Sequence, residues 1–280
     1  MQKTEINWTE LTWNPASGCD VVSTECKHCY AMTIAENKRG TLAFPKGFDM
    51  TLRPWKLAEP SRVKKPSLIF TNSMTDMFHD QIPDAYREQI LESMLDAPRH
   101  RYQVLTKRPE RARTFFATRR VPDCMWLGVT VGHPSTMWRV DELRAIDASV
   151  RFISAEPLLA HLPLDLSGIS WLISGGESGS HLSDADALSQ RGLVRRGVAK
   201  SGERRYVPRD DRAPWVRHLR DACVDLGIAY WFKQWGGPTP KSGGRELDGR
   251  TWDELPSHVA EAMPAGYVHR ADRVRLPIVV

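Results

Sequence analysis

Six short apolar segments recur along this chain, and their pattern limits the fold more than any other feature of the sequence. The segments are 67–72, 102–107, 126–131, 150–156, 171–176 and 228–236. Most of them are continuous β-rich runs rather than alternations of apolar and polar residues, which is typical of strands buried on both faces of a parallel sheet. The stretch 6–14 is the candidate for an additional first strand.

Apolar residues at helical spacing separate several of these segments, at 84–96, 136–146 and 213–227. The third pattern has Pro214 in its first turn and Gly227 at its end, which are common start and stop residues of a helix. Strands that alternate with helices indicate βαβ units and an α/β fold. We predict one barrel-like domain, open or closed, because the sequence has no internal repeat and no linker rich in Gly, Pro or Ser between halves.

Basic residues concentrate in one part of the chain. Residues 191–206 contain six Lys or Arg and one Glu, and this excess (six minus one) equals the net charge of +5 of the whole chain. The surrounding segment 177–212 is polar and has no clear periodicity, so we predict a long loop or lid there. Such a basic segment is typical of a phosphate-binding surface, and equally of a solvated loop.

The composition is that of a globular protein, with 41% hydrophobic and 26% charged residues. No apolar run approaches the length of a membrane span, and the N-terminus lacks the apolar stretch of a signal peptide, so we expect a cytoplasmic protein. The five cysteines are an odd number, and cytosolic thiols are kept reduced. We therefore interpret the group Cys19, Cys26 and Cys29 as metal-binding or redox chemistry rather than as a disulfide framework.

Polar residues follow five of the predicted strands directly. Because ligands of parallel α/β folds bind beyond the carboxyl ends of the strands, these residues are candidates for a binding site. They are Asn72, Ser73, Asp76, Lys107, Arg108, Glu156, Gly175, Gly176, Glu177, Lys233 and Gln234. A single polar residue after a strand is usually a helix cap, whereas five polar strand ends on one rim favour a site.

The three clustered cysteines have the spacing Cys-x6-Cys-x2-Cys, with no fourth cysteine nearby. Three thiolates on one loop can bind three irons of a four-iron cluster, which leaves the fourth iron open for a substrate or cofactor. Zinc is the alternative, with His28, His79, His133 or His161 as the fourth ligand. Unligated thiols are a third interpretation, and the spacing alone leaves all three open.

The ordered motifs of the chain resemble an uncharacterised family of phage and bacterial proteins that is described as radical-SAM-like. The motifs are NWTELTWNPASGC, CKHCYA, IFTNSMTDMFHD, QVLTKRPER, WLGVTV, RFISAEPLL, WLISGGESG, WFKQWG and LDGRTWDELP, and they extend from Trp8 to Pro256. The resemblance implies a partial TIM-like (β/α)6 barrel of the radical SAM type over residues 1–256, with the basic lid 177–212 inserted. Residues 257–280 would be a C-terminal extension.

The resemblance also implies the cofactors. Cys19, Cys26 and Cys29 would ligate a [4Fe-4S] cluster, and S-adenosylmethionine (SAM) would chelate the open iron through its amino and carboxylate groups. One electron would cleave the sulfonium and release a 5′-deoxyadenosyl radical, which abstracts hydrogen from the substrate. By their positions, the implied SAM contacts are Asn72, Ser73, Asp76, Lys107 or Arg108, Glu156, Gly175, Gly176, Glu177 and Tyr30.

Two departures from the usual radical SAM pattern stand out. The first cysteine spacer has six residues rather than three, and the Gly-Gly-Glu sequence (175–177) occurs at the end of segment 171–176 instead of at the second strand.

The basic segment favours a polyanionic substrate. We predict the radical-based modification of a nucleic acid or nucleotide, with Arg195, Arg196, Lys200, Arg204 and Arg205 as contacts. A reductase would donate the electron, and some bacterial members of the resembling family lie beside a "three-Cys-motif partner" protein, so a partner protein is also expected. The alternative function is a zinc-stabilised, non-catalytic protein that binds nucleic acid or a partner.

Overall fold

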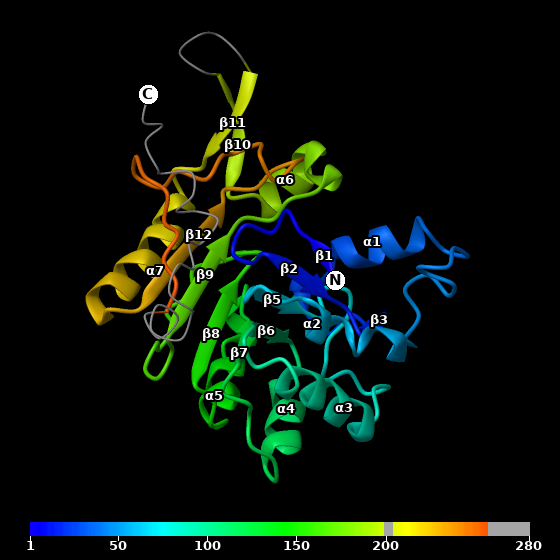
Figure 1. Cartoon of the computed structure of the whole chain (residues 1–280). Helices are drawn as coiled ribbons and strands as arrows, with labels where there is room; N and C mark the ends of the chain where they lie inside the picture. Colours follow the sequence, from blue (N-terminus) through cyan, green and yellow to red (C-terminus); the bar gives the residue numbers. More distant parts are fainter. Residues whose placement is uncertain (199–203, 257–280) are drawn as a thin grey trace, which may run out of the picture.

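A largely parallel sheet forms the framework of the molecule in a computed structural model that describes residues 1–198 and 204–256 (Figure 1). In sheet order its strands are β1 (Gln2–Lys3), β2 (Leu11–Trp13), β5 (Leu68–Thr71), β6 (Arg101–Thr106), β7 (Met125–Thr130), β8 (Val150–Ala155), β9 (Trp171–Gly175) and β12 (Ala229–Gln234). β1 is antiparallel to β2, and every other pair of neighbours is parallel. The seven strands predicted from the sequence are confirmed, in a mixed α/β fold.

The sheet is open rather than a closed barrel. Within the described ranges, no ladder pairs β12 with β1 or β2. The side-chain amide of Asn7 donates to the carbonyl oxygen of Lys233 at 3.3 Å, so a side-chain contact joins the N-terminal segment to the last strand.

Helices that connect the strands cover one face of the sheet. They are α3 (Asp84–Leu95), α4 (Pro109–Phe116), α5 (Arg139–Arg144) and α7 (Ala213–Leu226). Apolar side chains such as Ile90 of α3 and Leu219 of α7 share one buried cluster with Leu127 of β7. Gly227 caps the carboxyl end of α7, as the sequence predicts. Its φ of 66° is the left-handed conformation that glycine adopts readily.

One helix differs from its prediction. α5 begins at Arg139, and Trp138 before it is 46% exposed instead of belonging to the apolar stripe. Leu143 of the same helix is buried as expected.

Tryptophans fill the opposite face of the sheet. Trp171 makes edge-to-face contacts with Trp8, Trp126 and Trp231, with ring centroids between 6.0 and 6.3 Å apart. Phe70 and Phe152 complete this second cluster. The strands are therefore buried on both faces, which explains why they are continuous apolar runs in the sequence.

The remaining elements are short. They are β3 (Ala16–Ser17) paired with β4 (Thr51–Leu52), α1 (Tyr30–Glu36), α2 (Glu59–Arg62), α6 (Ala185–Arg191), and the 3-10 helices η1 (Thr24–Cys26), η2 (Pro54–Lys56), η3 (Pro134–Thr136) and η4 (Ser180–Ser183). No helix in the described part of the chain is both long enough and apolar enough to cross a membrane.

Segment 177–212, which we predict to be a long loop or lid, is not a long loop. This interval contains η4, α6 and an antiparallel hairpin of β10 (Val194–Val198) and β11 (Arg204–Pro208), which projects from the body of the molecule (Figure 1). Its elements are too short to show an apolar period. α6 has one buried side chain, Leu188, and depends on Asp184, whose carboxylate caps the first turn by accepting from two backbone N–H groups.

Candidate active site

The cysteine loop, residues 18–29, carries the three thiols and is hydrogen-bonded to segments at the carboxyl ends of several strands. Because the parallel strands all point the same way, their carboxyl ends form one edge of the sheet. Segments that follow β5, β6, β7 and β9 all contribute side chains to this loop. The three cysteines that we predict to be metal ligands therefore lie at the same edge of the sheet as the polar strand ends that we predict to form the site.

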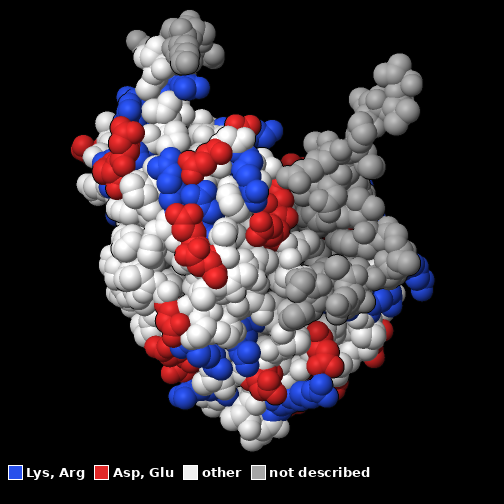
Figure 2. All heavy atoms as spheres, turned by 90° about the vertical axis from the view of Figure 1, so that its left-hand side faces the viewer, with Lys and Arg blue, Asp and Glu red and all other residues white. Residues whose placement is uncertain are grey.

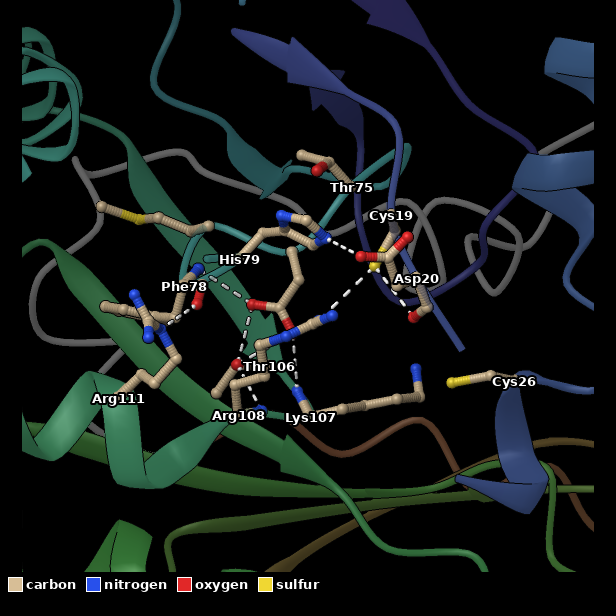
Figure 3. Close-up of polar contacts among 12 residues, drawn as sticks. Cys19, Asp20, Cys26, Thr75, Phe78, His79, Thr106, Lys107, Arg108 and Arg111 are labelled. Carbon is tan, nitrogen blue, oxygen red and sulfur yellow. Dashed lines mark hydrogen bonds and ion pairs between the residues drawn. The ribbon is translucent and has the colours of Figure 1, made fainter. Parts of the chain in front are cut away.

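Cys19 is held on both of its sides. The backbone N–H of Gly18 donates to the carbonyl of Met74 at 3.0 Å, and the Thr75 hydroxyl donates to the Gly18 carbonyl. On the other side, His79 Nε2 lies 2.9 Å from the carboxylate of Asp20 (Figure 3). Because His79 Nδ1 accepts from a backbone N–H at 3.1 Å, Nε2 carries the proton in the neutral ring and donates to Asp20.

Arg108, which follows β6, reaches the sulfur of Cys19. Its Nη1 lies 3.5 Å from Cys19 Sγ and 3.4 Å from the carboxylate of Asp76 (Figure 3). Arg108 and Asp76 are 6% and 5% exposed, so this pair is almost free of water. Burial and the charge of Asp76 raise the pKa of the Cys19 thiol, and Arg108 opposes that effect.

Cys26 is positioned through its neighbour Glu25. The buried Glu25 carboxylate accepts from the N–H of Gly132 at 2.9 Å and from the hydroxyl of Thr136 at 2.7 Å, and it lies 3.7 Å from Arg139. Burial opposes its ionisation, but hydrogen bonds outweigh burial and lower the pKa of Glu25 to about 2. Glu25 is therefore an anchor that fastens the loop to the end of β7.

All three thiols are free and partly exposed, and Cys29 directly precedes α1. A single zinc ion would bring its sulfur ligands to about 3.8 Å from one another. Within the described residues, no group of three His, Cys, Asp or Glu side chains is placed to hold one metal ion. Three free thiols on one anchored loop are donors of the kind that a four-iron cluster takes, with each thiolate on a different iron and one iron left open.

Asn72 at the end of β5 is the least satisfied of the predicted site residues. It is 3% exposed, and neither its side-chain oxygen nor its nitrogen has a hydrogen-bond partner among the described residues. Its φ of 63° is unusual for a residue other than glycine. A buried amide without partners costs free energy, and a ligand that bonds to it would remove that cost.

Ser73 and Tyr30 lie beside this residue but already have partners. The hydroxyl of Ser73 bonds to the side-chain amide of Asn14 at 3.1 and 3.2 Å. The Tyr30 hydroxyl donates to the carbonyl of Ser73 at 2.9 Å. Ser73 therefore joins the end of β2 to the end of β5, and Tyr30 joins α1 to the end of β5.

Asp76 has even more partners. Its carboxylate accepts from the N–H groups of Phe78 and Lys107, at 3.0 and 2.9 Å, and from the hydroxyl of Thr106, in addition to its contact with Arg108. The side chain of Lys107, by contrast, extends toward Cys26 (Figure 3).

The predicted residues after β8 and β9 form a second group on the same edge. Glu156 accepts from the Lys233 ammonium at 2.6 Å. Gly176 permits a close approach of two chain segments, since a Cβ there would lie 2.1 Å from the carbonyl oxygen of Trp235. A Cβ at Gly175 would lie 3.3 Å from Cβ of Lys233 and 3.5 Å from the carboxyl carbon of Glu156.

Glu177 belongs to a network that sequence reasoning missed. Arg191 of α6 donates to both carboxylate oxygens of Glu177, at 2.5 and 2.7 Å, and to the carbonyl of Thr24 in the cysteine loop at 3.1 Å. His181 lies 3.5 Å from the same carboxylate and stacks on His28. The basic character of 191–206 pointed to Arg191, but nothing in the sequence identified Glu25 or His181.

The basic residues of the hairpin are not joined to the cysteine loop by any contact within the described residues. Arg195 pairs with Asp210 at 3.4 Å, and Arg196 donates to the carbonyl of Ser183 at 2.6 Å. Arg205 is exposed opposite Gly197, and the backbone of Arg204 lies in β11. Lys200 lies outside the described residues. A depression of about 390 Å³ is lined by Arg196, Gly197, Val198, Arg205 and Tyr206.

The side of the molecule that carries α7 has a different surface. Acidic and basic side chains are interleaved there (Figure 2), and several are paired, such as Arg217 and Arg220 with Asp248 at 2.8 and 3.1 Å. This face therefore has no uniform positive charge.

Comparison with solved structures shows similarity to spore photoproduct lyase. A cysteine-to-serine mutant of that protein matches with a TM-score of 0.50 and 13% identity, over 80% of this chain and 76% of that chain. A mutant with bound AdoMet and dinucleoside spore photoproduct matches with a TM-score of 0.46 and 10% identity, over 79% and 75%. At these identities the similarity concerns the fold.

No curated protein matches the chain in sequence. A family model does match, over residues 3–195 and 197–256, and its description is "Protein of unknown function (DUF5131)". This match includes the cysteine loop, the strand ends and most of the hairpin. The chain therefore belongs to the DUF5131 family.

Proposed function

We propose that this protein is a radical SAM-type enzyme on a partial (β/α)6 barrel, with a [4Fe-4S] cluster held by Cys19, Cys26 and Cys29. The observation that carries the proposal is the placement of three free thiols on one loop that is bonded to the carboxyl ends of β5, β6 and β7. When bound, the cluster and SAM supply a 5′-deoxyadenosyl radical, made by one-electron cleavage of the sulfonium.

The polar residues of the edge would then bind and orient SAM. Asn72 presents an acceptor and a donor without partners, which suits the methionyl amine. Lys107 is the candidate for the carboxylate, because its ammonium extends toward the cysteine loop. Ser73, Asp76 and Tyr30 would act mainly by positioning, since their polar atoms already have partners.

The group after β8 and β9 would hold the nucleoside part of SAM. Glu156, Gly175, Gly176 and Glu177 lie at the carboxyl ends of these strands. Lys233 and Arg191 neutralise the two carboxylates, and hydroxyl groups of a ribose could share those acceptors. This edge would also exclude water from the reacting centre.

We further propose that the substrate is a nucleic acid or nucleotide. The hairpin places Arg195, Arg196 and Arg205 on a projecting two-stranded ribbon, with Arg204 and Lys200 in the same segment. Arginines on such a ribbon suit contacts with phosphates. The fold is similar to that of spore photoproduct lyase, which has been solved with AdoMet and a dinucleoside.

The other expectations stay proposals. A reductase would donate the electron, a partner protein would bind, and the protein would act in the cytoplasm. Residues 1–256 would form one domain with 257–280 as an extension.

Anaerobic reconstitution tests the cluster and SAM cleavage. The protein is incubated with iron and sulfide, its visible absorbance and iron content are measured, and 5′-deoxyadenosine is assayed after reduction with SAM present. We expect Cys26→Ala to lose both the absorbance and the product. Cys124→Ser is the matched control, because this buried thiol donates to the carbonyl of Met94, away from the cysteine loop, and its replacement should leave both readouts unchanged. Tightly bound zinc without iron uptake would instead support the zinc alternative.

Salt-dependent binding of single-stranded oligonucleotides tests the substrate class. Replacing Arg195 and Arg205 by Gln should lower the slope of log affinity against log salt by about 1.4, since each phosphate contact contributes about 0.7. The matched control replaces Arg113 and Arg120, two exposed arginines that pair with acids elsewhere, and should not change the slope. An absence of binding at every salt concentration would refute the nucleic-acid half of the proposal.

A further inference from the structure

One buried ion pair touches a proposed cluster ligand directly. Arg108 lies between Cys19 Sγ and the Asp76 carboxylate, at 3.5 and 3.4 Å (Figure 3). Arg108 is 6% exposed, so its guanidinium is not screened by bulk water. Among the described residues, no other guanidinium or ammonium group donates a hydrogen bond to Cys19, Cys26 or Cys29.

The geometry fixes both members of this pair. Asp76 accepts from the N–H groups of Phe78 and Lys107 and from the Thr106 hydroxyl, so its carboxylate cannot turn away from Arg108 without losing these bonds. The N–H of Arg108 itself donates to the Thr106 hydroxyl oxygen at 2.9 Å. The guanidinium is thus held against the sulfur by one rigid turn after β6.

From this geometry we infer that Asp76 and Arg108 together set the reduction potential of the cluster, with Cys19 as the point of contact. This inference rests on the proposed function, because it requires a cluster on the three cysteines. Arg108 and Asp76 act here as tuning residues, since they reach the cluster only through a ligand.

The expected direction follows from charge. Reduction of the cluster adds one electron, and therefore one negative charge, to a site with little water. A donor that bonds to a ligand sulfur and carries positive charge stabilises the reduced form more than the oxidised form, which raises the potential. The carboxylate of Asp76 acts in the opposite sense, because a nearby anion disfavours the added charge.

The two residues should consequently shift the potential in opposite directions. Arg108→Gln removes the cation, leaves the Asp76 anion and should lower the potential. Asp76→Asn keeps the shape of the side chain, leaves Arg108 unneutralised and should raise it. We expect each change to alter the ratio of reduced to oxidised cluster at a fixed potential by about tenfold, which corresponds to about 59 mV for one electron.

The test is a redox titration of the reconstituted full-length protein, followed by electron paramagnetic resonance of the reduced cluster. Arg108→Lys keeps the charge, so its potential should lie between that of Arg108→Gln and that of the unmodified protein. Arg111→Gln is the matched control, because Arg111, the third residue of α4, donates to the Phe78 carbonyl and pairs with Asp80 instead of a cysteine. Its potential should equal that of the unmodified protein.

Each outcome decides the inference. Opposite shifts in Arg108→Gln and Asp76→Asn support it, whereas unchanged potentials, or shifts of the same sign, overturn it. If one variant does not fold, the sign of the shift in the other decides. Failure of the unmodified protein to assemble any cluster would refute the proposed function instead, and iron content measured before the titration separates the two results.

Discussion

The imidazole rings of His28 and His181 stack face to face, with centroids 3.8 Å apart and an angle of 7° between their planes. His28 lies between two cysteines of the loop, whereas His181 lies in η4, ahead of α6 and the hairpin. Together with Arg191, which donates to the carbonyl of Thr24, this stack joins the inserted segment to the cysteine loop. Three predictions concern this junction and the anchors of the cysteine loop, and a fourth concerns a buried histidine elsewhere in the fold.

Removing the stack should loosen the cysteine loop without unfolding the molecule. We expect His181→Ala to lower the free energy of unfolding by about 1 kcal/mol, which is typical of one aromatic pair. Hydrogen exchange of the amides in residues 19–29 should become faster. His161→Ala is the matched control, since His161 also contacts another histidine ring, that of His218, at 4.6 Å. Equal exchange rates in the loop of both variants would contradict the prediction.

Arg191 should matter more than His181, because Glu177 is a buried acid that depends on it. Glu177 is 6% exposed, and Arg191→Met would leave its charge poorly compensated, at a cost of about 3 kcal/mol in urea unfolding. The double variant Arg191→Met with Glu177→Gln removes both charges and should be more stable than Arg191→Met alone. A double variant that is less stable than the single one would show that the ion pair is not the source of the loss.

Gly132 should not tolerate a side chain. A Cβ at this position would lie 2.1 Å from the carbonyl oxygen of Pro157 and 2.8 Å from Cγ of Glu25. Gly132→Ala must therefore displace either the backbone after β8 or the anchor of the cysteine loop, and we expect a loss of at least about 2 kcal/mol. Gly40→Ala is a useful comparison, because nothing lies within 4 Å of a Cβ there, although its φ of 82° adds some strain. Thermal unfolding of the two variants measures the difference.

Stability should fall in mild acid because of His100. This ring is fully buried, its Nε2 donates to the Pro60 carbonyl at 3.1 Å, and its Nδ1 has no partner among the described residues. Burial lowers the pKa of His100 below its ordinary value of 6.5. The neutral ring is the form that the fold accepts, so its contribution is complete above pH 6.5 and is lost as the pH falls through the lowered pKa.

His100→Gln checks this assignment. Glutamine keeps a donor for the Pro60 carbonyl but does not titrate, so the variant should lose less stability than the original protein between pH 7.5 and 5.5. Urea midpoints at the two values measure the change. If both proteins lose the same stability between these pH values, a group other than His100 causes the loss.

Much of the framework could be predicted from local patterns. Segments such as 126–131 and 150–156 are continuous apolar runs because both faces of the sheet are covered, and they became β7 and β8. The Pro214 and Gly227 signals marked α7 correctly. The hairpin after Gly192 was not predicted, because its strands are short and basic, few of their described side chains are buried, and their pairing depends on backbone bonds rather than on a buried face.

The residues of the candidate site could also be predicted from the sequence, but their mutual contacts could not. The spacing of Cys19, Cys26 and Cys29 and the polar strand ends are visible in the sequence, because parallel strands bring their carboxyl ends to one edge. The sequence did not show which of these groups contact one another. Asp76 resembled a free ligand in the sequence, yet in the structure its carboxylate is occupied by Thr106, Lys107 and Arg108.

The sequence by itself therefore determined which segments are buried strands, where the basic segment lies and where the three thiols group, since each depends on residues that are close along the chain. Only the tertiary structure decided that Arg108 meets Cys19, that Glu25 meets Gly132, and that the inserted segment is fastened to the cysteine loop. Such contacts join residues far apart in sequence, and they form only where folded strands place the following turns side by side. Hydrogen bonds and ion pairs require that proximity, whereas burial of an apolar run is recorded in its own local pattern.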